Sequence, residues 1–503
     1  MFQFNEFLEK NNLDSHLTYP VFKPYISKVQ NSVYKFIDTI LCKNKRVMLY
    51  GDYDLDGASC CLQWKYFFDS VGFSNYTIFP YNNRMHTLDP LLVKTVIEKK
   101  YDCCIINDTA TNEFSKIREL LCFKKEILII DHHEPKQGYA DYPNNCTIVN
   151  SCLEDDLVVS AGALVTHLLT AYTIEKFPEV NRVPFFVYGL ISLYADCIDM
   201  SHVKNVSLYH MAVNQNRVSL PALVKLLLPK YQILCRRAIE FNISPVINCG
   251  FRQEFFTALN NILYAQNKLG DVNLNDYIEQ LQNLHLQSAK RTATVADIIP
   301  VEQWDNFVIA NLDNVQQVYD IESTHLYNYT GLVANKLSEK YVKPAIVLCS
   351  RGEVYKGSFR DIQSRDYLSL LQQLCYAEGH KPAFGIEIPK LNINRFLRQL
   401  KKLDSKQMNT SIPNKPIIVS LTEFDLTEKL VHDIALYNEF TGSRPVALIK
   451  LNALTTLKTK GYRNSRYHFT INDIPVSSAK SLFTTSSVLV KPTIGKQDKL
   501  YVI

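Results

Sequence analysis

Short apolar runs alternate with amphipathic stretches over the first third of the chain. Four runs have the length and composition of buried strands, and segments with apolar residues at helical spacing separate them. The predicted strands are Val47–Tyr50, Tyr76–Pro80, Cys103–Ile106 and Ile127–Ile130. Strands that alternate with helices predict an α/β fold, in which helices cover both faces of a mostly parallel sheet. The ligand site of such a sheet lies beyond the carboxyl ends of its strands.

Polar clusters follow three of these strands at that edge. They are Asp52, Asp54 and Asp56 after the first strand, Asp108 after the third, and Asp131, His132 and His133 after the fourth. Alternate side chains of an extended segment point the same way, so the first three aspartates would crowd one site and repel one another. A bound cation would relieve that repulsion. The alternative is an acidic loop that caps the helix predicted from Ser59.

The residue types in these clusters indicate a particular metal chemistry. Carboxylates and imidazoles without a thiolate are typical of Mn²⁺ or Mg²⁺ sites rather than of structural zinc. Asp196, which ends a later apolar helix, is a further candidate ligand. Two ions about 3.5–4 Å apart that share a carboxylate can generate a hydroxide for an in-line phosphoryl displacement. Taken singly, Asp108 could instead cap a helix, and Asp196 could be a buried salt-bridge partner.

Periodicity and length divide the 503 residues into four expected parts, because one ordinary domain would not hold them. Residues 1–204 form the α/β domain with a helical lead-in. Residues 205–304 have helical spacing without a chemical motif and predict a connector. Residues 305–388 alternate again and predict a smaller α/β domain. Residues 389–503 begin with a basic helix and continue with strands, so we expect a basic, β-containing C-terminal domain.

Charge is unevenly distributed along the chain. The net charge is +5, yet the segment Ile386–Ile503 holds 18 lysines and arginines against 9 acidic residues. Tyr462, Tyr467, His468 and Phe469 lie among the basic residues of this tail. Basic residues that follow phosphates and aromatic rings that stack on bases are typical of single-strand binding. A lysine-rich accessory β domain is the alternative for the tail.

Cysteine usage and hydropathy predict a compartment. The 13 cysteines are an odd number, lack the CxxC spacing and lie mostly in apolar runs, so we expect reduced thiols. The first residues lack the pattern of a signal peptide, and no run approaches the roughly 18 apolar residues of a membrane span. We therefore expect a protein of the bacterial or phage-infected host cytoplasm, without a membrane partner.

Four ordered segments resemble the motifs of the DHH phosphoesterase superfamily. They are Tyr50–Gly57, Asn107–Thr109, Ile130–His133 and Leu193–Asp196, and Ser160–Gly162 resembles the helix start between the last two. The surrounding sequence is most similar to RecJ-type single-strand exonucleases. Gly331–Ala334, Lys356–Arg360 and Gly379-His380 resemble the DHH-associated domain of that superfamily, although Glu378 replaces a glycine that is usual there. The resemblance covers about residues 35–200 and 325–388.

The resemblance implies a role for each metal ligand. Asp54 would bind one divalent cation and Asp56 the other, and Asp108 would bridge them. His132 and Asp196 would complete the second ion. Mn²⁺ is expected in preference to Mg²⁺.

Further roles follow from the same resemblance. Asp52 would be an additional ligand or a nearby base, and His133 would face the substrate phosphate or the metal centre. Asp131 would orient His132 through its other ring nitrogen. Ser358, Arg360, Gly379 and His380 would bind substrate phosphate, and His380 would also stabilise the transition state. Asp52, His133 and His380 are thus the residues expected to be catalytic.

The resemblance implies a metal-dependent exonuclease that cuts single-stranded DNA in the 5′→3′ direction with a hydroxide activated by two metals. We expect a monomer that prefers DNA to RNA, serves DNA repair and recombination, and has replication or repair proteins as partners. One alternative is a phosphodiesterase of short RNA, adenosine bisphosphate or cyclic dinucleotides. A second alternative is a non-catalytic replication scaffold of the same superfamily.

Overall fold

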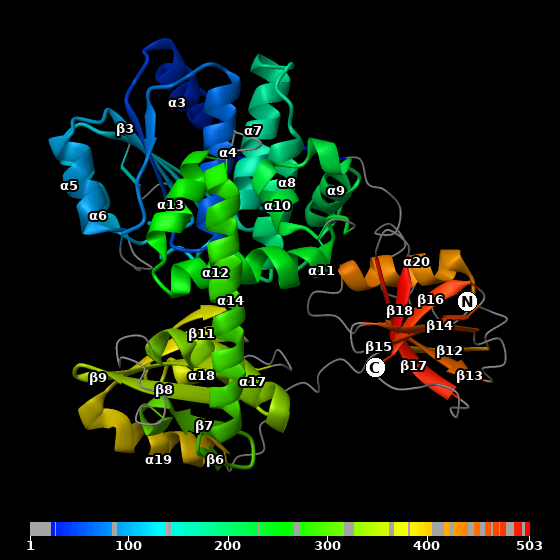
Figure 1. Cartoon of the computed structure of the whole chain (residues 1–503). Helices are drawn as coiled ribbons and strands as arrows, with labels where there is room; N and C mark the ends of the chain where they lie inside the picture. Colours follow the sequence, from blue (N-terminus) through cyan, green and yellow to red (C-terminus); the bar gives the residue numbers. More distant parts are fainter. Residues whose placement is uncertain are drawn as a thin grey trace. The chain divides into compact units, whose positions relative to one another are not determined.

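A computed structural model gives the structure of the chain, and Figure 1 labels its elements. The described residues are 22–25, 27–82, 88–136, 138, 142–143, 145–155, 157–200, 202–229, 232–265, 272–315, 326–361, 367–380, 383–404, 417–422, 426–440, 447–452, 458–463, 466–471, 473–478, 487–494 and 498–502. Two compact units contain them: residues 1–281 together with 416–503, and residues 282–415. Among the helices described, none has the length and hydropathy needed to span a bilayer.

The first unit contains the parallel sheet that the sequence predicts. Its strands are β1 (Val47–Gly51), β2 (Tyr76–Ile78), β3 (Cys103–Asn107), β4 (Glu126–Asp131) and β5 (Cys146–Asn150). Their order is β2-β1-β3-β4-β5, and every neighbouring pair is parallel. The α/β fold is therefore confirmed. β5 has no counterpart among the predicted strands, because Thr147 and Asn150 interrupt its short apolar run.

Helices cover both faces of this sheet. They are α3 (Gln30–Cys42), α4 (Leu55–Ser70), α5 (Pro90–Glu98), α6 (Phe114–Cys122), α7 (Ala161–Lys176), α8 (Val183–Ala195) and α9 (Val203–Val213). The chain passes from β1 to β2 and then back past β1 to β3, so right-handed crossovers place α4 on one face and α5 and α6 on the other. α4, α7 and α8 pack against one another and are buried over most of their surface (Figure 1).

Residues 205–304 are mostly helical, as predicted, and belong to both units. The helices are α10 (Ala222–Leu227), α11 (Arg236–Ala238), α12 (Ser244–Arg252), α13 (Phe256–Ala265) and α14 (Val272–Ile298). The boundary between the units falls inside α14. Leu274 and Leu281 pack in the core of the first unit, whereas Val295 and Ile299 pack in a core of the second. The predicted connector is therefore divided between the two units.

The second unit is built on a six-stranded sheet. Its strands are β6 (Val301–Gln303), β7 (Val308–Asn311), β8 (Ala345–Arg351), β9 (Val354–Arg360), β10 (Tyr376–His380) and β11 (Ala383–Pro389), in the order β10-β11-β9-β8-β7-β6. Helices α17 (Thr330–Tyr341) and α18 (Leu368–Leu371) lie between strands in the sequence. The expected boundary at 388 is wrong, because Phe396 and Leu400 of α19 (Ile393–Asp404) pack in a core of this unit. The basic residues of α19 predict that it belongs to the C-terminal domain, but its buried apolar residues pack in the second unit.

Residues 416–503 form a seven-stranded sheet with one described helix, α20 (Glu428–Glu439). The strands are β12 (Ile417–Thr422), β13 (Ala447–Asn452), β14 (Lys458–Arg463), β15 (Arg466–Ile471), β16 (Ile474–Ser478), β17 (Ser487–Thr493) and β18 (Lys499–Val502). Their order is β12-β13-β17-β18-β16-β15-β14. The β12–β13 and β16–β18 pairs are parallel, and the others are antiparallel. This segment belongs to the same compact unit as the α/β domain.

Candidate metal centre

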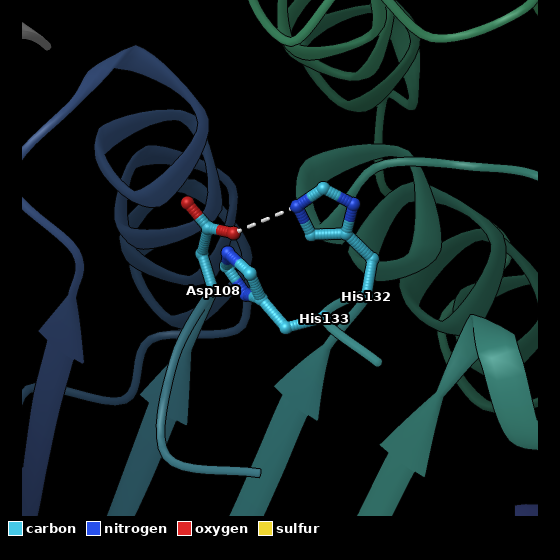
Figure 2. A group of neighbouring side chains, drawn as sticks. All are labelled: Asp108, His132 and His133. Atoms are coloured by element: carbon cyan, nitrogen blue, oxygen red, sulfur yellow. Dashed lines mark ion pairs between the residues drawn. The ribbon is translucent and has the colours of Figure 1, made fainter. Parts of the chain in front are cut away.

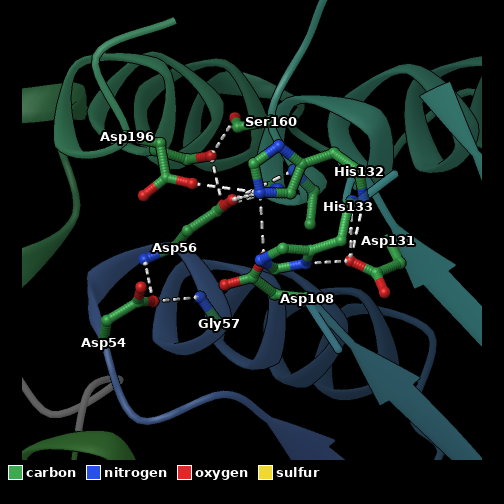
Figure 3. Close-up of polar contacts among 12 residues, drawn as sticks. Asp54, Asp56, Gly57, Asp108, Asp131, His132, His133, Ser160 and Asp196 are labelled. Atoms are coloured by element: carbon green, nitrogen blue, oxygen red, sulfur yellow. Dashed lines mark hydrogen bonds and ion pairs between the residues drawn. The ribbon is translucent and has the colours of Figure 1, made fainter. Parts of the chain in front are cut away.

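The polar clusters predicted from the sequence converge at one edge of the parallel sheet. Asp52 and Asp54 follow β1, Asp108 follows β3, Asp131 ends β4 and His132 follows it, as Figure 3 shows for most of the group. Asp196 reaches the same place from the C-terminal end of α8. These side chains form three overlapping sets, and within each set the ligand atoms all lie within 4.8 Å of one another. The convergence expected at the carboxyl ends of the strands is therefore present.

One set is arranged around the imidazole of His132. Its Nε2 lies 3.1 Å from Oδ2 of Asp196, 3.2 Å from Oδ1 of Asp108 and 3.8 Å from Oδ2 of Asp56. Figure 2 shows the pair of His132 and Asp108. These four residues are the ones expected around the second ion, and their ligand atoms form one compact group. Carboxylate oxygens with one imidazole nitrogen suit a divalent cation of the Mn²⁺ or Mg²⁺ type.

Asp108 is common to all three sets. It joins Asp52 and Asp54 in a second set, and His132 and His133 in a third. The carboxylate of Asp108 is therefore shared by neighbouring ligand sets. Its backbone has a φ of +61°, a left-handed conformation that is strained for a residue other than glycine, and its N–H donates to the carbonyl of Ile130 at 2.8 Å. The fold therefore holds Asp108 in an unfavourable conformation at the centre of the cluster.

Asp54 and Gly57 define how β1 passes into α4. Oδ1 of Asp54 accepts hydrogen bonds from the N–H of Asp56 at 2.9 Å and of Gly57 at 3.0 Å, so Asp54 caps the helix. The sequence predicts that this helix begins at Ser59, but α4 begins at Leu55. The alternative of an acidic helix cap is correct for this one side chain. It does not exclude a metal role, because Asp54 also belongs to a ligand set.

Asp56 is held by the start of α7. Its carboxylate accepts hydrogen bonds from the N–H of Gly162 at 2.7 Å, from that of Ala161 at 3.0 Å, and from the hydroxyl of Ser192. A Cβ on Gly162 would lie 2.8 Å from Oδ1 of Asp56, so a larger residue would push the carboxylate away. This explains the small residues after Ser160. Ser192 was missed, since a serine within the apolar run of α8 carries no signal that distinguishes it from a buried helix serine.

Asp131 supports a different histidine from the one expected. Its Oδ1 lies 2.7 Å from Nδ1 of His133, and it accepts from the backbone N–H groups of both histidines. Oδ2 accepts from the N–H and hydroxyl of Thr111, at 3.1 and 2.5 Å. The prediction that Asp131 orients the ring of His132 is therefore wrong. The ring of His132 turns toward Asp108 instead, and adjacent residues present their side chains in different directions.

The pKa shifts show that this buried cluster resists full ionisation. Burial, together with the charge of Asp196, raises the pKa of Asp56 to about 7. Burial and the nearby Asp56 raise the pKa of Asp108 well above its usual value. Burial lowers the pKa of His132, but its hydrogen bonds to Asp108 and Asp196 outweigh this and leave the pKa well raised. A divalent cation would stabilise the ionised carboxylates, so the donor set fits such an ion.

We expect metal affinity to rise with pH. Asp56, with a pKa of about 7, binds a proton at pH 6 that a cation must displace, so the Mn²⁺ dissociation constant should fall about tenfold from pH 6 to 8. The raised pKa also means that the metal-free fold loses stability as the pH rises from about 4 to 7. Calorimetric titration with Mn²⁺ at several pH values measures the first effect. An affinity that is constant between pH 6 and 8 would contradict it.

Helices of the connector also contact the chain just after β1 and just after β2. The N–H of Leu55 donates to Oδ1 of Asn248 in α12 at 3.1 Å. Asn260 in α13 makes two hydrogen bonds of 2.8 Å with the backbone of Tyr81, one as donor and one as acceptor. The sequence revealed no role for Asn248. Such contacts depend on helices that lie far away in the sequence.

In the second unit, Ser358 and Arg360 lie beside the N-terminus of α17. A Cβ on Gly331 would be 2.8 Å from Nη2 of Arg360 and 3.4 Å from Oγ of Ser358. The hydroxyls of Ser358 and Thr330 are 2.9 Å apart. A helix N-terminus with a guanidinium and two hydroxyls is suited to an oxyanion. The sequence does not predict a role for Thr330, because the segment that resembles the DHH-associated domain begins at its neighbour Gly331.

His380 and Gly379 are placed only by their backbone. His380 pairs with Ala383, which in turn pairs with Arg360, so the three residues are in register across β10, β11 and β9. The side chain of His380 lies outside the described residues, and its catalytic role stays a prediction. Gly379 has a φ of +136°, a conformation that disfavours any residue with a side chain.

Comparisons with known proteins find similarity to the DHH family and to single-strand DNA exonucleases. Residues 46–188 match the model of the DHH family, N-terminal domain. The chain is 21% identical over 479 residues to the single-stranded-DNA-specific exonuclease RecJ of Bacillus subtilis (strain 168), in a match that covers 90% of this chain and 58% of that protein. It is 24% identical over 326 residues to the putative SPbeta prophage-derived single-strand DNA-specific exonuclease YorK of the same bacterium, covering 58% and 54%. The chain thus spans little more than half of these relatives.

Solved structures give the same result for the fold. The crystal structure of RecJ from Thermus thermophilus in complex with Mn²⁺ matches with a TM-score of 0.74 and 16% identity, over 99% of this chain and 74% of that one. The structure of RecJ from the same organism in complex with Mg²⁺ matches with a TM-score of 0.66 and 13% identity, over 99% and 73%.

Proposed function

We propose that the chain is a RecJ-like, metal-dependent exonuclease of the DHH phosphoesterase superfamily that hydrolyses single-stranded DNA, because residues 46–188 match the DHH family model and the chain is similar to RecJ exonucleases. The observation that carries the proposal is the position of Asp108 in all three ligand sets. A scaffold protein would have no need to keep a strained, buried carboxylate among other carboxylates. The proposal includes 5′→3′ polarity, a preference for Mn²⁺ over Mg²⁺ and a monomeric state, each of which stays a prediction.

Each residue of the centre has a proposed task. Asp56, Asp108, His132 and Asp196 would hold one divalent cation, and Asp54, Asp108 and Asp52 a second. When bound, the ions supply Lewis-acid chemistry, which activates water and neutralises charge on the phosphate. His133, which Asp131 holds in position, is half exposed and would meet the substrate phosphate. Burial lowers its pKa, but the bond to Asp131 raises it overall, which favours a cationic ring.

A phosphate-binding role is proposed for the second unit. Ser358, Arg360 and the N-terminus of α17 offer hydroxyl, guanidinium and N–H donors close together. Gly379 and His380 lie on strand β10, two strands away from Arg360 in the same register. We infer that this group holds a phosphate of the substrate strand.

The topology of residues 447–502 supports single-strand binding. If β13 and β14 are treated as two halves of one strand, the pairing runs from β14 through β15, β16, β18 and β17 back to β13. This is the strand order of a five-stranded oligonucleotide-binding barrel, with its one parallel pair between the third and fifth strands. We propose that the basic tail binds DNA through this barrel. β12 and α20 would be additions to it.

A substrate panel tests the proposal. The protein with Mn²⁺ should shorten 5′-labelled single-stranded DNA to mononucleotides, act much less on duplex DNA, and lose all activity with a chelator. Cleavage of RNA dinucleotides or cyclic dinucleotides alone would favour the short-substrate alternative. A complete lack of metal-dependent hydrolysis, with binding of single strands intact, would favour the scaffold alternative.

A further inference from the structure

Glu439, the last residue of α20, is a buried carboxylate outside the metal centre. Only about 6% of its surface is exposed. Its Oε2 accepts hydrogen bonds from the backbone N–H of Arg236 at 2.8 Å and from the hydroxyl of Tyr209 at 3.0 Å. Its backbone carbonyl accepts from the hydroxyl of Tyr194 at 3.1 Å. All three partners lie more than two hundred residues earlier in the sequence.

The residues on either side of Glu439 extend this contact in two directions. Asn438 is tied to the C-terminal sheet, because its amide both donates to and accepts from the backbone of Ala447 in β13, at 3.0 and 2.8 Å. Its backbone carbonyl accepts from the guanidinium of Arg236 at 3.1 Å. Phe440 packs its ring edge-on against Tyr209, with centroids 4.9 Å apart. The end of α20 therefore joins the C-terminal sheet to the helices of the α/β domain.

One of the partner residues lies on the helix that ends at the candidate metal centre. Tyr194 lies in the last turn of α8, two residues before Asp196. Tyr209 lies in α9, and Arg236 begins α11. The helix that ends in a candidate metal ligand is thus also the helix that contacts the end of α20.

A buried carboxylate is costly unless its partners compensate it. Burial raises the pKa of Glu439 to about 7, against the opposing effects of the Arg236 N–H and the Tyr209 hydroxyl. An apolar residue would fill the same volume without that cost. A carboxylate that accepts two directed hydrogen bonds from separate helices, however, fixes orientation as well as contact.

We propose that Glu439 is a positioning residue that fixes the C-terminal domain on α8, α9 and α11, so that a long strand bound by that domain is held at a set distance from the metal centre. The proposal rests on the proposed nuclease function for its effect on the substrate. The docking itself does not depend on that function. Substrates too short to reach the C-terminal domain should not depend on Glu439.

The test compares four variants of the full chain: Glu439→Ala, Glu439→Gln, Tyr209→Phe and, as a control, Glu179→Ala at an exposed carboxylate. Hydrogen exchange over α9 and α20 reports docking. Glu439→Ala should speed exchange there about tenfold, since a buried bond is worth roughly 1–3 kcal/mol. Glu439→Gln keeps both acceptor contacts and should stay near the wild type. Tyr209→Phe, which keeps its ring, should give a smaller increase.

Activity separates positioning from support of the fold. On single strands of about 30 nucleotides, longer than one oligonucleotide-binding fold covers, Glu439→Ala should lower kcat/KM about tenfold. On a dinucleotide it should change kcat/KM less than about twofold, because the metal centre is intact. Equal losses on both substrates, or unchanged exchange over α9 and α20, would overturn the proposal. If the wild type cleaves neither substrate, the nuclease function fails, and hydrogen exchange alone decides the docking.

Discussion

Replacing Asp108 with asparagine should abolish hydrolysis and at the same time stabilise the metal-free protein. The side chain belongs to all three ligand sets, so its loss removes the shared carboxylate from both proposed ions. Metal-ion stabilisation of transition-state charge is worth several kcal/mol, and about 4 kcal/mol corresponds to a rate loss of roughly a thousandfold. We therefore expect Asp108→Asn to lower kcat at least that much.

The gain in stability follows from the pKa of the same group. Burial and the charge of Asp56 raise the pKa of Asp108 well above its usual value, which means that the fold disfavours its ionised form. A neutral amide at this position removes that unfavourable charge. In the presence of a chelator, the unfolding midpoint should rise by about 2–4 °C, measured by calorimetry. With Mn²⁺ the order should reverse, because only the wild type gains from the ion.

The opposite signs distinguish a metal ligand from a structural residue. A variant that merely misfolds would lose activity and stability together. Asp155→Asn is the matched control, since this aspartate is exposed and paired with Lys28 on the surface. It should leave both properties unchanged. Activity above about a tenth of the wild type in Asp108→Asn would refute the bridging assignment.

Replacing Gly57 with alanine should reduce activity by displacing the backbone of the loop between β1 and α4. A Cβ at this position would lie 2.3 Å from the backbone nitrogen and 2.5 Å from the backbone carbonyl oxygen of Asp52. Neither atom can rotate away as a side chain can, so the loop between β1 and α4 must shift. Gly51 faces the same constraint, because its Cβ would lie 2.3 Å from the carbonyl oxygen of Gly57.

The expected result of Gly57→Ala is a drop of about a hundredfold or more in kcat/KM, since small misplacements of catalytic groups cost that much. The unfolding midpoint should also fall by several degrees. Gly72→Ala serves as the control: it has a φ of +73° but nothing within 4 Å of the added Cβ. That variant should lose only about 1 kcal/mol of stability and keep its activity. Similar activity losses in both variants would show that the close contact with Asp52 is not the cause.

The role of Gly57 also differs from the one that its sequence suggests. A glycine after an acidic loop predicts a sharp turn into the next helix. The helix has already begun at Leu55, and Gly57 is not among the described glycines with positive φ. What the position requires is space, because the first turn of α4 packs directly on the end of β1.

Local pattern was enough for the parallel sheet and for the residues at its carboxyl edge. Apolar runs of strand length define β1, β3 and β4, and parallel strands necessarily present their following residues at one edge. The strand pattern alone therefore predicts that Asp54, Asp108 and His132 lie at one site. The polar pattern of α19, by contrast, gave the wrong domain, because basic residues on one face say nothing about what covers the other.

The amino-acid sequence by itself determined which groups could meet at the metal centre, and the tertiary structure decided how they are held. The pairing of Asp131 with His133, the support of Asp56 by the start of α7 and the burial of Glu439 against Tyr209 all depend on side-chain directions. Two of these contacts join residues more than a hundred positions apart. Periodicity reports only the face on which a residue lies, so contacts between separate elements emerge only when those elements pack.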